Sequence, residues 1–332
     1  MALGERHAPL RSGRAATDCA RTGGPAAAMR RRRGILSEGT TRGGCGLFGP
    51  EIIRATMSRE RTYGTGDAAR LWQYHSRSDY HSKVAALALA IDLLHESPEL
   101  RDGVERGEIG FEVNPKMRDG TDREKTLDLR FARVDDARPL RQPRTLLRLA
   151  EQYELVLGDE CLEVLATLPT VWEARAKEQL IVFENKACMT AHQKAAPRLR
   201  NELEGAVKAI NATKPRAVAA GLVMVNAATE FYSPVWKANG WVATAAEREA
   251  TVHRQPQDAF GAAQKLKNIP RRRTVEEEGY DALAIVVVSA RNDGTAWRLV
   301  DDPAAGAPES TSIWNYVAVV QRVAELYRER FA

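Results

Sequence analysis

The sequence is poor in cysteine and has no long apolar run, and each absence excludes a class of protein. Its 332 residues include four cysteines, at positions 19, 45, 161 and 188, and no two of them are two to four residues apart. This spacing excludes a disulfide framework and a zinc knuckle, so we expect a reduced, cytoplasmic protein. No stretch approaches the roughly 18 consecutive apolar residues that span a bilayer, so we expect no membrane insertion.

Two recognisable signals are also missing. Residues 1–50 contain no apolar core of the kind that a secretory signal needs. The chain has no G-x-x-x-x-G-K-[ST] loop for holding the phosphates of a nucleotide. We therefore expect neither secretion nor ATP-driven translocation by this chain.

Positive charge is concentrated at the N-terminus. The formal net charge is +5, but residues 1–64 hold 12 arginines against 5 acidic residues, whereas the other residues hold 37 basic and 39 acidic groups. We expect residues 1–64 to be a basic, disordered arm, which either contacts phosphates or has no role. Residues 65–332 are expected to form a single α/β domain. Its charge balance gives no global argument for a nucleic-acid partner, so such an argument depends on local clusters.

Apolar patterns in residues 65–332 predict alternating helices and strands. Helical spacing predicts amphipathic helices at 80–96 and 313–331, a helical stretch at 146–165, and a helix that begins at Pro197. Apolar and β-rich segments predict strands at 108–114, 125–134, 180–183, 217–227 and 282–290. The strands lack polar alternation. This predicts an α/β fold with a central mixed β-sheet flanked by helices on both faces.

Charged residues interrupt two of these apolar strands. Asp128 lies between two leucines, and Glu184 and Lys186 follow the apolar run 180–183. Side chains two apart on a strand point to the same face, so Glu184 and Lys186 are expected to be neighbours. If the two strands pair, their backbones lie about 4.8 Å apart, and the carboxylates of Asp128 and Glu184 can meet.

Two carboxylates at the end of a buried sheet repel each other unless a cation lies between them. Mg²⁺ prefers hard oxygen ligands of this kind. A nearby lysine ammonium can orient the attacking water and stabilise charge on a phosphate. Asp128, Glu184 and Lys186 therefore include the groups needed to hydrolyse a phosphodiester. The alternative is a structural ion pair at a strand end, with Asp128 capping a turn.

The pattern Asp128 … Glu184-Asn185-Lys186 resembles the PD-(D/E)XK nuclease superfamily, in particular type II restriction endonucleases. The resemblance covers roughly residues 80–290 and implies a restriction-endonuclease-like fold. It implies that Asp128 and Glu184 bind Mg²⁺, that the carbonyl of Asn185 adds a ligand, and that Lys186 positions the attacking water. The chain departs from the family at Thr126-Leu127, where a proline often precedes the aspartate.

Three groups of basic residues are candidate DNA contacts. A cluster after the Glu-x-Lys segment is either a phosphate clamp or a solvated helix start: His192, Lys194, Arg198 and Arg200. Residues 74–83, which include Lys83, either contact DNA or form a polar helix cap through Ser78 or Asp79. The triplet Arg271, Arg272 and Arg273 either contacts the DNA backbone or lies in an exposed loop.

These features predict a Mg²⁺-dependent DNA endonuclease of the type II restriction class. We expect its partner to be double-stranded DNA and its form to be a homodimer, because cutting two strands at a palindromic site suits two active sites related by two-fold symmetry. A cognate DNA methyltransferase is expected to be encoded nearby. Two alternatives stay open: a repair or modification-dependent nuclease, and a non-catalytic DNA-binding or regulatory module on the same fold.

Overall fold

The structure is a computed structural model that describes residues 46–64, 70–118, 124–134, 144–237, 240–242 and 249–332. Within Gly46–Ala332, which form one unit, the helices are α1 (Gly49–Met57), α2 (Tyr80–Glu96), α3 (Pro98–Glu105), α4 (Leu146–Gln152), α5 (Asp159–Leu165), α6 (His192–Thr213), α7 (Gln257–Lys267) and α8 (Tyr316–Phe331), with a 3-10 helix η5 (Pro303–Ala305).

Six strands form the central sheet: β3 (Ile109–Val113), β6 (Leu129–Arg133), β7 (Glu178–Cys188), β8 (Val218–Asn226), β13 (Ala282–Ser289) and β14 (Arg298–Leu299). The other described strands form two-stranded ribbons: β1 (Arg61–Tyr63) with β2 (Arg70–Trp72), β4 (Lys116–Arg118) with β5 (Glu124–Thr126), β9 (Glu230–Tyr232) with β12 (Ala250–Val252), and β10 (Val235–Lys237) with β11 (Gly240–Val242).

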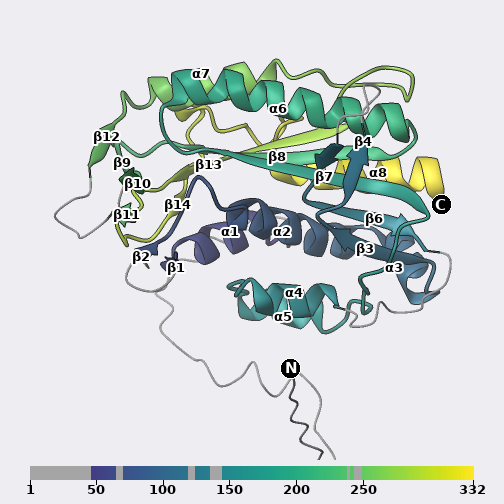
Figure 1. Cartoon of the computed structure of the whole chain (residues 1–332). Coiled ribbons are helices and arrows are strands. Elements are labelled where there is room, and N and C mark those ends of the chain that lie inside the picture. The colour runs from purple at the N-terminus through teal and green to yellow at the C-terminus, as the bar shows by residue number, and fades with distance from the viewer. Residues whose placement is uncertain (1–45, 65–69, 119–123, 135–143, 238–239, 243–248) are drawn as a thin grey trace, which may run out of the picture. The chain divides into compact units, whose positions relative to one another are not determined.

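The central sheet is mixed and has helices on both faces. Its strand order is β14-β13-β8-β7-β6-β3. β7, β8 and β13 are parallel, whereas β7, β6 and β3 are antiparallel, as are β13 and β14. α2 and α8 cover one face, and α6 and α7 cover the other (Figure 1). This confirms the predicted fold class.

The parallel strands are apolar because both of their faces are covered. Every residue of β8 is buried, and seven of the eight residues of β13 are buried. Side chains of these strands contribute alternately to two apolar cores, one beneath α2 and α8 and one beneath α6 and α7. A strand covered on both faces shows no polar alternation, which is the pattern seen in the sequence.

Helix α2 has the bounds that the apolar spacing predicts, but it is not amphipathic. Nearly all of its residues are buried, because α1, α4, α8 and the sheet surround it. Three polar residues of α2, Ser82, Lys83 and Asp92, are therefore buried with it. A buried polar group needs a partner, so each of them must be satisfied inside the protein.

The folded part begins earlier than the predicted residue 65. α1 packs against α2 and buries Ile53 and Met57 completely. The buried carboxylate of Asp92 accepts hydrogen bonds from the amides of Phe48 and Gly49 at 2.8 and 2.7 Å. It thereby satisfies donors that the start of a helix leaves unpaired. Residues 1–45 of the predicted arm lie outside the described residues.

Four predicted elements have clearly different bounds in the structure. The strand expected at 180–183 is longer and extends over Glu178–Cys188 as β7. The strand expected at 125–134 is divided into β5 and β6, with Asp128 between them. The stretch expected to be helical at 146–165 is divided into α4 and α5. The helix expected from Pro197 begins at His192, after Ala191 in a left-handed conformation with φ 50°, so Pro197 lies inside α6.

Cys161 and Cys188 are both free and buried; the other two cysteines lie outside the described residues. Within the part of the chain that the structure describes, no helix combines the length and apolar character needed to cross a membrane.

Candidate functional site

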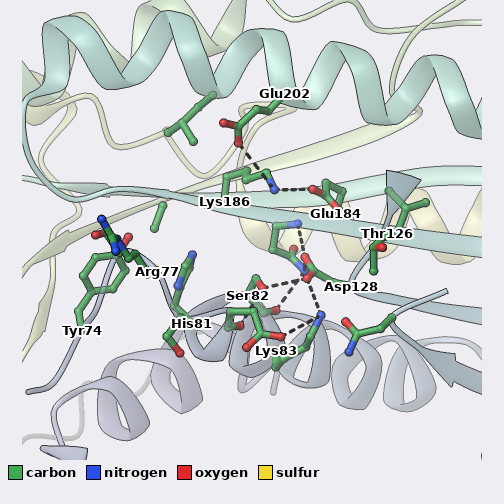
Figure 2. A pocket seen from close by; sticks show the side chains of 18 of the residues that line it. Tyr74, Arg77, His81, Ser82, Lys83, Thr126, Asp128, Glu184, Lys186 and Glu202 are labelled. Atoms are coloured by element: carbon green, nitrogen blue, oxygen red, sulfur yellow. Dashed lines mark hydrogen bonds and ion pairs between the residues drawn. The ribbon is translucent and has the colours of Figure 1, made fainter. Parts of the chain in front are cut away.

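A cleft of about 430 Å³ lies between the first half of α2, the segment before β6, strand β7 and helix α6 (Figure 2). The three residues predicted to form the active site, Asp128, Glu184 and Lys186, all line it. Other residues that line the cleft and bear on its chemistry are Tyr74, Ser82, Lys83, Asn185, Arg198 and Glu202. The structure thus brings the predicted catalytic residues into one place, from two separate segments of the chain.

Asp128 lies just before β6. Its backbone amide still pairs with β7, but the next amide of β7 on this edge donates to the Asp128 side chain instead of to a backbone carbonyl. Leu129 is paired with Phe183 of β7, and the Asp128 amide donates to the Phe183 carbonyl at 3.1 Å. One carboxylate oxygen of Asp128, Oδ2, accepts a hydrogen bond from the Asn185 amide at 2.7 Å. The carboxylate is therefore fixed against β7 by a donor of that strand.

The other carboxylate oxygen of Asp128 faces the first turn of α2. Ser82 Oγ and Lys83 Nζ each donate to Oδ1 at 2.8 Å, and Asn185 Nδ2 donates to Oδ2 at 3.3 Å. The carboxylate therefore accepts about as many hydrogen bonds as its lone pairs allow. Lys83 was expected to contact DNA; instead its ammonium is buried in an ion pair with Asp128. A buried ammonium needs a charged partner, and Asp128 is that partner, so Lys83 cannot reach DNA.

Glu184 and Lys186 lie on the same face of β7, as their spacing predicts. Lys186 Nζ is 2.6 Å from Glu184 Oε1 and 3.9 Å from Glu202 Oε2 on α6. Figure 2 shows this group toward α6, whereas Asp128 is grouped with Ser82 and Lys83 beside α2. Each of the two buried carboxylates of the cleft, Asp128 and Glu184, thus has its own ammonium partner. Their convergence on one metal ion stays a prediction.

Burial dominates the electrostatics of the pair on β7. It raises the pKa of Glu184 to about 7, and the charge of Asp128 adds to the rise while Lys186 opposes it. Burial by itself lowers the pKa of Lys186, but the neighbouring carboxylates, first among them Glu184, outweigh it and leave this pKa raised. The raised pKa favours the ammonium form of Lys186, in keeping with its ion pair with Glu184.

The carboxylate oxygens of Asp128 and Glu184 are of the chemical type that a hard divalent cation prefers. Among the described residues, no three or more His, Cys, Asp or Glu side chains gather as a metal-binding group. A metal here would use two carboxylates and neutral oxygens. The Oδ1 of Asn185 is buried without a hydrogen-bond partner and its Nδ2 contacts Asp128, but this side chain points to the opposite face of β7 from Glu184 and Lys186. Carboxylate and amide oxygens suit Mg²⁺. The resemblance implies the carbonyl of Asn185 as a ligand and gives no signal for this side-chain oxygen.

His192 was predicted to clamp phosphate, but it is a buried structural residue. Its Nε2 lies 2.7 Å from the Asn226 carbonyl at the end of β8, and its ring packs edge-on against His253 with centroids 4.6 Å apart. Burial lowers the pKa of His192. Because α6 begins at residue 192, this side chain contacts the end of β8 instead of lying on an exposed turn.

Of the other cations predicted on this helix, Arg198 is the one that lines the described cleft. Its side chain is 71% exposed, with Nε 3.7 Å from Glu202 Oε1. Lys194 is exposed outside the cleft. Arg200 donates to Glu204 at 2.6 Å, one turn along α6. The predicted clamp is thus reduced to a single arginine at the cleft.

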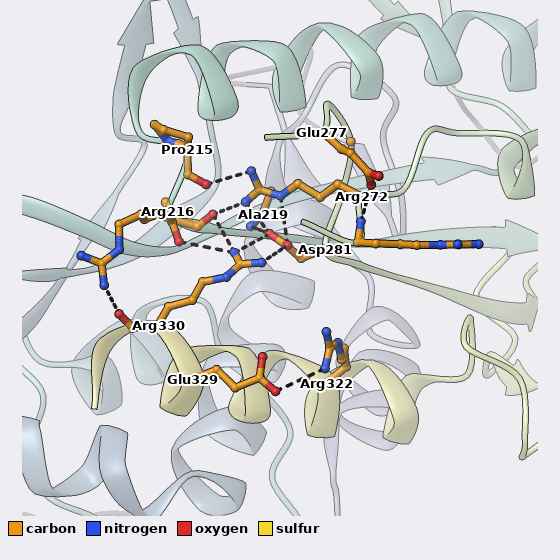
Figure 3. A network of polar contacts seen from close by, with 12 residues as sticks. Pro215, Arg216, Ala219, Arg272, Glu277, Asp281, Arg322, Glu329 and Arg330 are labelled. Carbon is orange, nitrogen blue, oxygen red and sulfur yellow. Dashed lines mark hydrogen bonds and ion pairs between the residues drawn. The ribbon is translucent and has the colours of Figure 1, made fainter. Parts of the chain in front are cut away.

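The arginine triplet does not form the predicted row of DNA contacts. The side chain of Arg272 is fully buried and donates to Asp281, and Arg330 of α8 donates to the same carboxylate (Figure 3). Arg271 is partly buried, with its guanidinium 5.2 Å from the centre of the Trp314 ring. Arg273 is exposed. The assignment of Arg272 to DNA is therefore wrong, because its charge is used inside the fold.

The segment before α2 forms one wall of the cleft and is held by a buried amide. Asn292 Oδ1 accepts from the Tyr74 amide at 2.8 Å, and Asn292 Nδ2 donates to the Tyr74 carbonyl at 3.0 Å. Ser78 Oγ accepts from the Tyr80 amide at 3.1 Å, whereas Asp79 makes no side-chain cap hydrogen bond. Of the two predicted cap residues, Ser78 thus has the role. The contact with Asn292 spans 218 residues, so no local pattern reveals it.

Comparison with known proteins gives no relative: no family model matches the chain, and no curated protein or solved structure matches it significantly.

Proposed function

We propose that this chain is a divalent-metal-dependent endonuclease that hydrolyses phosphodiester bonds in double-stranded DNA. The observation that carries the proposal is the meeting of Asp128, Glu184 and Lys186 in one cleft. The chain order also supports it: helix α2, antiparallel strands β3 and β6, strand β7 with Glu-x-Lys, and helix α6. That order is the one expected from the resemblance to PD-(D/E)XK nucleases.

The residues of the cleft have different roles in the proposed reaction. Asp128 and Glu184 would hold Mg²⁺, with the carbonyl of Asn185 as the further ligand that the resemblance implies; when bound, the metal would supply positive charge for the phosphate and lower the pKa of a water molecule. Lys186, as an ammonium, orients the attacking water and stabilises the negative charge that develops on the phosphate. Arg198 at the cleft contacts the DNA backbone without reading its sequence.

The finer assignment is a type II restriction enzyme, and it rests on the resemblance. Such an enzyme would act in the cytoplasm as a homodimer, with a cognate DNA methyltransferase encoded nearby. Two symmetric copies suit a palindromic site because each copy cuts one strand. A repair or modification-dependent nuclease would use the same cleft and differ in which DNA it cuts.

A second candidate is a non-catalytic DNA-binding module, and one observation favours it. Both buried carboxylates already have an ammonium partner, Lys83 for Asp128 and Lys186 for Glu184. The charge of the cleft is therefore balanced without a metal. This candidate predicts salt-sensitive DNA binding with no metal-dependent cutting.

Digestion of a phage genome by the purified protein tests the proposal. Fragments should appear with Mg²⁺ and not with EDTA, and sequencing of their ends should give one recurrent cut position for a restriction enzyme. Cutting restricted to methylated, damaged or branched DNA would favour the other nucleases. Binding without any cutting, on DNA of every kind, would contradict the proposal and support the non-catalytic module.

A further inference from the structure

The ammonium group of Lys83 lies between a buried carboxylate and an exposed one. Its Nζ is 2.8 Å from Asp128 Oδ1 and 4.0 Å from Asp79 Oδ2. The Asp128 side chain is 9% exposed, whereas that of Asp79 is 66% exposed. Lys83 therefore has an inner partner in the cleft and an outer partner closer to solvent, one turn earlier on the chain.

Lys186 has the same arrangement on the other side of the cleft. Its Nζ is 2.6 Å from Glu184 Oε1 and 3.9 Å from Glu202 Oε2. The Glu184 side chain is 6% exposed and that of Glu202 is 42% exposed. Arg198 lies nearest the other oxygen of Glu202, Oε1, so Oε2 is the one that faces the lysine.

The inner positions of the two ammonium groups conflict with metal binding. Asp128 already accepts four hydrogen bonds from described residues, and among these donors Lys83 is the charged one. A divalent ion bound by the same carboxylate would be repelled by an ammonium at hydrogen-bond distance, most strongly in a buried site. Binding of a metal therefore requires the ammonium to move away. The nearest carboxylates toward which the two lysines can move are Asp79 and Glu202.

We propose that Lys83 and Lys186 are displaceable counter-ions, and that Asp79 and Glu202 accept their ammonium groups when a divalent cation binds Asp128 and Glu184. This inference rests on the proposed function, because it assumes that the cleft takes up a metal. Asp79 and Glu202 are then positioning residues rather than metal ligands. Because the transfer keeps each lysine paired, it lowers the free-energy cost of emptying the inner site.

A double-mutant cycle on Lys186 and Glu202 tests the transfer. Binding of Mn²⁺ without DNA is measured by calorimetry and by the paramagnetic resonance of free Mn²⁺. Glu202→Gln should weaken binding about two- to fivefold, the amount expected from loss of an exposed ion pair. Lys186→Met should strengthen it, because no cation needs to leave. In the Lys186→Met background, Glu202→Gln should change the affinity by less than about twofold.

The cycle distinguishes transfer of the Lys186 ammonium to Glu202 from a direct electrostatic effect of Glu202 on the metal. If Glu202 acted only through its charge on the metal, Glu202→Gln would weaken binding equally with and without Lys186, and the proposal would be overturned. Glu204→Gln, on the same helix and paired with Arg200, is the control and should leave Mn²⁺ affinity unchanged.

The pair on α2 gives an independent second cycle, with Asp79→Asn and Lys83→Met. Because Lys83 is buried, thermal melting must first establish that the Lys83→Met variant is folded. If this variant is unfolded, the cycle at Lys186 and Glu202 alone tests the proposed transfer. Coupling in both cycles, or in the measurable one, supports transfer. Absence of coupling overturns it.

Failure of the inference differs from failure of the proposed function. If the wild type binds no Mn²⁺, or binds it equally well after Asp128→Asn and Glu184→Gln, both the metal site and the transfer are excluded. If those two variants lose binding but neither cycle shows coupling, the transfer alone is excluded and the metal site stands.

Discussion

The ammonium of Lys83 on α2 lies 2.8 Å from the carboxylate of Asp128, and both side chains are buried. Lys83 and Asp128 are 45 residues apart in the chain, and their ion pair joins α2 to the segment just before β6. It also places a positive charge where the sequence pattern predicts a metal ion. The electrostatics of the cleft thus depend on lysines as much as on carboxylates.

Removal of this ammonium should destabilise the fold. Lys83→Met leaves the Asp128 charge buried without its counter-ion, so we expect the free energy of unfolding to fall by about 3–5 kcal/mol. Urea unfolding measures it. Lys116→Met, which breaks an exposed ion pair with Glu124, is the matched control and should cost less than about 1 kcal/mol. Equal effects of the two variants would contradict a structural role for the buried pair.

The buried cluster around Asp281 predicts a second large effect on stability. Asp281 receives hydrogen bonds from Arg272 and Arg330, and Arg272 also donates to the carbonyls of Pro215 and Ala217, just before β8 (Figure 3). Asp281→Asn leaves two arginines without their shared carboxylate, and should cost about 3–5 kcal/mol in urea unfolding. The exposed Asp301→Asn should be close to neutral. A near-neutral Asp281→Asn would show that the cluster does not hold α8 to the sheet.

The early start of the fold is tested by a core substitution in α1. Ile53 is fully buried against α2, so Ile53→Ala should lower the free energy of unfolding by about 2–5 kcal/mol. The exposed Arg59→Ala is the control. If residues before 65 were a disordered arm, both substitutions would leave thermal and urea unfolding unchanged.

Glu184 should make stability depend on pH. Burial, with help from Asp128, raises its pKa from 4.5 to about 7 in the folded protein, so the folded state binds the proton more tightly than the unfolded state. The resulting stabilisation is present at low pH and is lost as the pH rises from 4.5 toward 7. Relative to Glu184→Gln, the wild type should lose at most about 3 kcal/mol between about pH 4 and about pH 8. Parallel pH profiles of the two proteins would contradict the raised pKa.

The sequence allows much of the sheet and part of the site to be predicted, because those features depend on local periodicity. The bounds of α2 follow from apolar spacing, and the shared face of Glu184 and Lys186 follows from the two-residue repeat of a strand. Asp128 is conspicuous because it interrupts an apolar run.

The errors come from contacts between distant segments. Lys83 and Arg272 look like surface cations in the sequence, and only the folded chain brings Asp128 and the buried Asp281 to them. His192 was misassigned because α6 begins five residues before Pro197, which a proline rule for helix starts does not reveal. Charge pairing in three dimensions, rather than residue type, decides whether a cation can contact DNA.

Cleavage of supercoiled plasmid with Mg²⁺ tests the central claim most directly, in a comparison of the wild type with folded Asp128→Asn, Glu184→Gln and Lys186→Met variants. We predict that the wild type cuts, that each variant cuts at least about 100-fold more slowly, and that Lys194→Met, outside the cleft, retains the wild-type rate. Cutting by Lys186→Met at the wild-type rate would contradict the assignment of this cleft as the active site.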